Sequence, residues 1–123
     1  MLYPIMIIFY VTNPSESVNF YQKILGIEPL ESSPTFAMFD LNNNVLLGLW
    51  AMHTVQPTPT ITPGGFEIAF TLQTKKDVDD LFNTWIKQGL KIVQQPTNMD
   101  FGYTFVAADL DGHRLRVFTP VQS

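Results

Sequence analysis

Residues 108–118 read Ala-Asp-Leu-Asp-Gly-His-Arg-Leu-Arg-Val-Phe, and they predict a tight turn followed by a strand. Asp111-Gly112 is a strong turn signal, because glycine tolerates a positive φ and aspartate can bond its own backbone. Beyond the turn the side chains alternate, so Arg116 and Phe118 share one face of the strand and the aliphatic residues take the other. An arginine on that face is informative if the face lines a cavity, because a buried unpaired charge is too costly to keep.

The size and composition of the chain indicate one globular domain. It has 123 residues, of which 46% are hydrophobic and 15% charged. The net charge of −4, without a basic cluster, argues against a nucleic-acid partner. Disulfide and thiolate chemistry are excluded because the sequence has no cysteine. The apolar segment at 1–10 is short and lacks basic residues, so it predicts a buried strand rather than a signal peptide or a membrane span. We therefore expect a cytoplasmic protein with no membrane partner.

The order of predicted elements occurs twice along the chain. Each repeat begins with a strand, at 5–11 and at 66–72, and continues with a helix whose N-cap is Asn13 or Thr74. Further extended segments are predicted at 27–30, 35–41, 45–50, 90–94 and 103–108 and after the Asp111-Gly112 turn, with a loop at 96–102. Residues 56–65 hold three prolines and two glycines, which favours a connector over a proline-rich recognition motif.

These elements predict a single domain of two βαβββ modules, at about 3–53 and 64–121, joined by the Pro/Gly-rich linker 56–65. Each module is too small to close a core alone, so the two should pair side by side. The expected fold class is α+β: a curved mixed β-sheet built from the two repeats, with the helices on its outer face.

Several segments resemble the vicinal oxygen chelate superfamily, which contains glyoxalases, bleomycin-resistance proteins and ring-cleaving dioxygenases. They are Asn-Phe-Tyr-Gln-Lys-Ile-Leu-Gly at 19–26, the segment 89–102, and 109–118, in the two-module order. The resemblance covers nearly the whole chain. It implies the glyoxalase/bleomycin-resistance fold more specifically than any activity, because this superfamily holds isomerases, dioxygenases, thiol transferases and drug-binding proteins on one scaffold.

The resemblance also implies a metal site, with one ligand from the first and one from the last strand of each module. Carried onto this sequence, the four positions are Met6, Leu47, Glu67 and Arg116. Only Glu67 suits a divalent first-row metal, and Arg116 brings a positive charge to the place of the cation. The residues on either side of these four add no ligand. We therefore predict a site without metal or cofactor, and no catalytic residue.

An ion pair is expected at this site in place of a metal. The first and last strands of the second module should be neighbours, which places Glu67 and Arg116 on one face. Arg116, held by Glu67, would offer spare N–H donors to an anionic or carbonyl group of a ligand; the alternative is a purely structural pair. Strand alternation and the resemblance predict a ligand-binding set of Met6, Ile8, Phe36, Met38, Leu47, Leu49, Trp50, Glu67, Tyr103, Phe105, Arg116 and Phe118.

Tyr103 is the best single candidate for ligand contact in this set, because its ring could stack while its hydroxyl donates. The alternative for the aromatic members is that they fill the core.

Three functions are compatible with these features. The first is a metal-free small-molecule binding protein of the bleomycin-resistance type, which sequesters an aromatic or amphiphilic ligand. The second is a glyoxalase-like or dioxygenase-like enzyme, a lyase or oxidoreductase that depends on a divalent metal. The third is an interaction module that has lost its ligand. The resemblance implies a homodimer. The sequence does not identify the ligand, nor whether the modules pair within one chain or swap between two.

Overall fold

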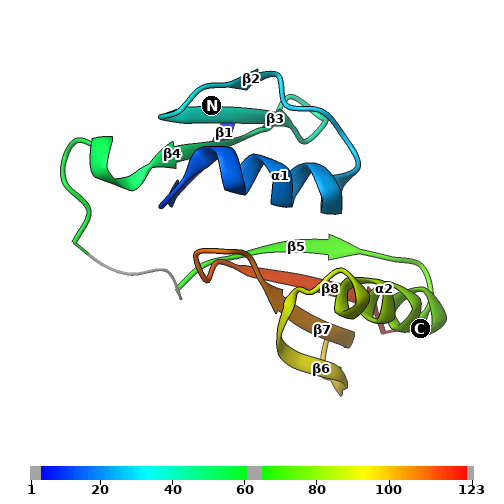
Figure 1. The fold of residues 1–123 in the computed structure, drawn as a ribbon. Helices are drawn as coiled ribbons and strands as arrows, with labels where there is room; N and C mark the ends of the chain where they lie inside the picture. The colour runs from blue at the N-terminus through cyan, green and yellow to red at the C-terminus, as the bar shows by residue number, and fades with distance from the viewer. Residues whose placement is uncertain (1–3, 61–64, 122–123) are drawn as a thin grey trace. The chain divides into compact units, whose positions relative to one another are not determined.

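The structure is a computed structural model that describes residues 4–60 and 65–121. The chain forms two compact units, residues 1–62 and 63–123 (Figure 1). The predicted module starts at residues 3 and 64, and residues 61–64 of the predicted linker, lie outside the described residues. Within the described ranges, none of the helices is long and apolar enough to span a membrane.

The first unit is a four-stranded mixed sheet with one helix. Its elements are β1 (Met6–Val11), α1 (Pro14–Leu25), β2 (Glu31–Ser32), β3 (Phe36–Asp40) and β4 (Leu46–Ala51), followed by the short 3₁₀ helix η1 (Met52–Thr54). The strand order is β1-β4-β3-β2. Strands β1 and β4 run parallel and the other pairs antiparallel, so the chain crosses over the sheet through α1.

The second unit repeats this arrangement. Its elements are β5 (Glu67–Thr71), α2 (Lys75–Lys87), β6 (Lys91–Met99), β7 (Gly102–Ala108) and β8 (Arg114–Pro120). The strand order is β5-β8-β7-β6, with β5 and β8 parallel and the other pairs antiparallel. The α+β class and the repeated βαβββ order predicted from the sequence are therefore confirmed.

The two helices begin at the predicted caps. Asn13 Oδ1 accepts a hydrogen bond from the Glu16 backbone at 3.3 Å, and Thr74 Oγ1 accepts one from the Asp77 backbone at 3.0 Å. Each cap satisfies one of the backbone N–H groups that a helix leaves without a partner in its first turn. These polar signals are local in sequence, which is why they can be identified without the structure.

Each helix covers one face of its own sheet, which we call the helix face; the opposite face is the open face. In the first unit Tyr21 of α1 meets Phe39 of β3, with ring centroids 6.5 Å apart. In the second unit Trp85 of α2 meets Phe70 at 6.3 Å and Phe105 at 5.5 Å. The core of each unit is therefore the layer between its helix and its helix face.

Strand β6 differs from the sequence prediction. A loop was expected at 96–102, but β6 continues to Met99 and pairs with β7 through two register shifts, at Ile92/Gln94 and Gln94/Thr97. An edge strand with such irregularities tolerates Pro96, which has no N–H to donate. The extended segment predicted at 27–30 is also wrong, because β2 begins at Glu31.

Candidate functional site

The guanidinium of Arg116 is the centre of a polar cluster on the open face of the second unit. Its Nε donates to Glu67 Oε1 at 2.6 Å, from β8 to the neighbouring strand β5. The predicted ion pair is therefore present. The Arg116 side chain is only 18% exposed, whereas that of Glu67 is 35% exposed. The arginine thus lies along the sheet and is not extended into solvent.

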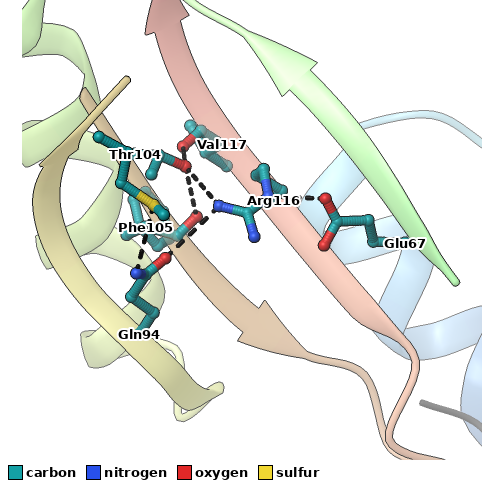
Figure 2. Close-up of polar contacts among 7 residues, drawn as sticks. Glu67, Gln94, Thr104, Phe105, Arg116 and Val117 are labelled. Atoms are coloured by element: carbon teal, nitrogen blue, oxygen red, sulfur yellow. Dashed lines mark hydrogen bonds and ion pairs between the residues drawn. The ribbon is translucent and has the colours of Figure 1, made fainter. Parts of the chain in front are cut away.

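Two residues from β6 and β7 hold the other end of the guanidinium (Figure 2). Nη1 of Arg116 donates to Thr104 Oγ1 at 3.2 Å and, over a longer 3.4 Å, to Gln94 Oε1. Thr104 in turn donates its hydroxyl proton to the carbonyl oxygen of Val117 at 2.9 Å. The guanidinium is thereby fixed from both sides, because one nitrogen bonds Glu67 and a second bonds Thr104 and Gln94.

A ring lies against the charged plane. The Phe101 centroid is 5.5 Å from Arg116 Cζ, and Phe101 meets Phe118 edge to face at 5.8 Å. Such cation–π contacts orient a guanidinium without consuming its hydrogen-bond donors. Among the residues that the structure describes, Nη2 of Arg116 has no hydrogen-bond partner. The cluster therefore presents a positioned, partly desolvated cation with donors to spare, next to aromatic surface.

The open face of the first unit is apolar and aromatic. Register places Met6, Ile8 and Tyr10 of β1 on the same side as Gly48 and Trp50 of β4. Phe36 and Met38 of β3 join them, since they pair with Trp50 and Gly48. The predicted placement of Met6, Ile8, Phe36 and Met38 on one face is therefore correct, and Trp50, which alternation with Leu49 would have put on the other face, joins them.

Leu47 and Leu49 do not belong to that face. Both are 0% exposed, and their neighbours in register are Ile7 and Phe9 of β1, whose side chains point toward α1. The prediction that they line the open face is wrong by one residue: Gly48, which lies between them in sequence, is on the open face instead. A Cβ at Gly48 would lie 3.1 Å from the Phe36 ring and 3.3 Å from Met6 Sδ.

Tyr103 and Phe105 are also on the other face from the one predicted. Strand β7 pairs Thr104 with Phe118 and Val106 with Arg116, so Thr104 and Val106 point to the open face. Tyr103 instead donates its hydroxyl proton to Asp79 of α2 at 2.7 Å. Phe105 is 0% exposed and packs on Phe82, 5.3 Å between centroids. Neither residue is adjacent to Arg116 on its face of the sheet.

The contact with Asp79 gives an expected pH dependence. The hydrogen bond to Asp79, aided by burial, raises the pKa of Tyr103 above its ordinary value of 10.0. A raised folded-state pKa means that the unfolded chain loses this proton first, so stability falls as the pH rises above the ordinary value. Urea unfolding between about pH 9 and pH 11 should therefore show a steeper alkaline loss in the wild type than in Tyr103→Phe. Equal slopes in the wild type and in Tyr103→Phe would contradict the prediction.

The four positions implied for metal ligands do not carry a suitable donor set. Met6 offers a thioether, and Leu47 has no donor atom and is buried toward α1. The carboxylate of Glu67 and the guanidinium of Arg116 are already bonded to each other. Divalent first-row metals take imidazole, thiolate or carboxylate ligands, and a guanidinium repels them. Within residues 4–60 and 65–121, no group of three or more His, Cys, Asp or Glu is placed to hold a metal. The donor chemistry thus does not fit a metal centre.

Sequence reasoning missed Gln94, Thr104 and Phe101 as members of the cluster. Gln94 was assigned only to an extended segment, and Thr104 to the wrong face. A signal for Thr104 exists, because it is the polar residue that begins the apolar run to residue 108. No sequence signal identifies Gln94, because its position depends on the register shifts of β6.

Comparisons with known proteins agree with this architecture. The chain is 35% identical to the phenazine antibiotic resistance protein EhpR of Enterobacter agglomerans, over 93% of this chain and 89% of that protein. It is 30% identical to the metallothiol transferase FosB of Staphylococcus haemolyticus, over 92% of this chain and 80% of that protein. The solution structure of protein ATC0852 from Agrobacterium tumefaciens is 48% identical and superposes with a TM-score of 0.90, over 99% of this chain and all of that one.

A family model gives the assignment directly, because it matches residues 5–117, which includes β1, both helices and most of β8. The chain therefore belongs to the Glyoxalase/Bleomycin resistance protein/Dioxygenase superfamily.

Proposed function

We propose that this protein is a metal-free small-molecule binding protein of the resistance type, which sequesters an aromatic ligand carrying an anionic or carbonyl oxygen. The observation that carries the proposal is the Arg116 cluster. Its guanidinium is held by Glu67 and Thr104, has donors left over, and lies against the Phe101 ring. A charged donor beside an aromatic surface can bind the oxygen and the ring of one ligand together.

The first unit supports the same ligand class. Its open face offers Trp50 and Tyr10, which meet edge to face at 6.2 Å, along with the flexible side chains of Met6 and Met38. Methionine and aromatic side chains adapt to bulky planar compounds. The similarity to a phenazine antibiotic resistance protein points to the same class, since a phenazine is a planar fused-ring molecule.

The proposal includes a cytoplasmic homodimer as the functional form. Ile8 and Tyr10 are 43% and 40% exposed on β1, which is an edge strand of its sheet. Apolar side chains on an edge strand are often covered by a partner in solution. Size-exclusion chromatography with light scattering tests this part, because a monomer at micromolar concentration would contradict it.

The metal-dependent enzyme is the second candidate, favoured by the similarity to a metallothiol transferase. The donor set argues against it, because only Glu67 of the four positions suits a divalent ion and its carboxylate is bonded to Arg116. A thermal-shift assay with Mn²⁺, Ni²⁺ and Zn²⁺, with and without chelator, separates the two functions. A saturable, chelator-sensitive rise in Tm would support the enzyme, whereas the binding protein should show none.

The ligand test compares phenazine-1-carboxylate with unsubstituted phenazine by isothermal titration calorimetry. Arg116→Met keeps the apolar stem but removes the donors, and should weaken binding of the carboxylate by roughly ten- to a hundredfold. Binding of unsubstituted phenazine should change by only about twofold. Arg114→Met is the matched control, since it removes the same charge two residues earlier on the same face of β8. Equal losses in the two variants, or no binding of either compound by the wild type, would overturn the proposal.

A further inference from the structure

The hydrogen bonds that hold the Arg116 guanidinium limit what a ligand can bind there. A guanidinium has five N–H groups in one plane, one on Nε and two on each terminal nitrogen. The Nε–H bonds Glu67, and Nη1 makes two hydrogen bonds, to Thr104 and to Gln94. Within the described part of the chain, the N–H groups that remain for a ligand are therefore both on Nη2.

This pattern removes the usual way in which an arginine binds a carboxylate. A bidentate pair needs two parallel N–H groups, which belong to two different nitrogens. Each such pair on Arg116 includes either Nε or Nη1, and both of these nitrogens are already bonded. A ligand carboxylate can therefore accept only from Nη2, and it would lie next to the carboxylate of Glu67, which repels it.

Glu67 offers a free acceptor beside this free donor. Its Oε1 is bonded to Arg116 Nε at 2.6 Å, and among residues 4–60 and 65–121 its Oε2 accepts no hydrogen bond. Figure 2 shows the unbonded nitrogen of Arg116 and the unbonded oxygen of Glu67 on the same side of the ion pair. The Glu67 side chain is 35% exposed, so a ligand can reach it. A donor and an acceptor therefore lie next to each other on the open face.

The ion pair has no net charge with which to attract an anion, because the charges of Glu67 and Arg116 compensate each other across 2.6 Å. The next side chain of β8 on this face belongs to Arg114, which is exposed and forms no ion pair with the described residues. Water and salt screen an exposed charge, so Arg114 adds only weak attraction. The site thus favours a neutral polar group.

We propose that the Glu67–Arg116 pair binds a primary carboxamide of the aromatic ligand, or the equivalent edge of a lactam. Arg116 Nη2 donates to the carbonyl oxygen of the ligand, and Glu67 Oε2 accepts the N–H that lies beside this carbonyl. The exposed Phe101 ring, which already lies against the guanidinium, packs on the aromatic part of the ligand. This inference rests on the proposed function and names the substrate class within it.

The test is isothermal titration calorimetry of the full chain above about pH 7, where a carboxylic acid is ionised. The ligands are phenazine-1-carboxamide, N-methylphenazine-1-carboxamide and phenazine-1-carboxylate. A trans secondary amide holds its N-substituent on the side of the carbonyl oxygen, so the methyl group replaces the N–H that Glu67 would accept. The primary amide should bind about fivefold or more tighter than either of the others, the effect of one hydrogen bond to a charged group.

The ligand series separates this inference from the function on which it rests. If the N-methyl amide or the carboxylate bound as tightly as the primary amide, the carboxamide inference would be overturned and the proposed function would stand, because these ligands would still be bound. If the wild type bound neither these compounds nor unsubstituted phenazine, both would be overturned.

Glu67→Gln tests the acceptor in the protein itself. The variant loses the negative charge that repels a carboxylate, so the preference for phenazine-1-carboxamide over phenazine-1-carboxylate should fall about fivefold or more. The ratio compares two ligands on one variant, so a general loss of folded protein does not change it. Glu16→Gln makes the same substitution at an exposed position of α1 and should keep the ratio within about twofold of the wild type. An unchanged ratio in Glu67→Gln would overturn the inference.

Discussion

Replacing Phe105 with alanine is expected to lower the free energy of unfolding by about 3–5 kcal/mol, the usual cost of deleting a buried phenyl ring. Phe105 is 0% exposed and makes edge-to-face contacts with Phe82 at 5.3 Å and Trp85 at 5.5 Å. The ring therefore joins β7 to α2, and the space left by alanine is enclosed by rigid aromatic neighbours. Urea unfolding followed by tryptophan fluorescence and circular dichroism would measure the change.

Phe101→Ala is the matched control for this prediction, because it deletes the same ring from the same unit. Phe101 is 42% exposed, so its loss should cost less than about 1 kcal/mol of stability. It lies against Arg116, and its removal should instead weaken binding of phenazine-1-carboxylate. A small stability loss in Phe105→Ala, no larger than that in Phe101→Ala, would mean that Phe105 does not lie in the core between β7 and α2.

The features that could be predicted from the sequence are those with local signals. The cap residues Asn13 and Thr74 indicate where the two helices begin, because each is followed three residues later by an acidic residue. The helical spacing of Trp85 with Leu81 and Phe82 predicts that Trp85 lies in the core, and its side chain is 4% exposed. The Glu67–Arg116 pair could be predicted because a crossover through one helix makes the first and last strands of a module neighbours.

The errors in assigning side chains to faces have one physical cause, which is that alternation identifies the faces of a strand only where one face is exposed to water. Strand β7 is buried on nearly every residue, so Phe105 and Val106 look equally internal in sequence although they point to opposite faces. Strand β4 shows the same ambiguity at Leu47, Gly48 and Leu49. A shift of one residue then moves every side chain of the strand to the other face.

The same uncertainty about strand faces affects the Arg116 cluster. The strand order predicts its ion pair with Glu67. The contacts of Arg116 with Thr104 and Gln94, however, depend on the register of β7 and on the register shifts of β6. Non-local register has no signature in a single sequence when the strands lack a polar face. The charge of the site could thus be inferred, whereas the partners that position this charge could not.

Replacing Gly102 with alanine is expected to destabilise the protein by roughly 2–6 kcal/mol, because backbone strain and steric overlap act together. Gly102 has a φ of +151°, a backbone conformation that residues with a Cβ rarely adopt. A Cβ there would overlap the Thr119 carbonyl oxygen and lie 3.0 Å from Pro120 Cα. Because the obstacle is backbone, no side chain can rotate away, and β7 must separate from β8 at this end.

Gly112→Ala separates the two contributions. Gly112 also has a positive φ, +92°, but a Cβ there would meet nothing within 4 Å. Its substitution should therefore show backbone strain alone, about 1–2 kcal/mol, and leave the difference between the variants as the cost of the overlap at the β7–β8 junction. If chemical denaturation gave equal losses of unfolding free energy for Gly102→Ala and Gly112→Ala, β8 would have moved away from residue 102 at negligible cost.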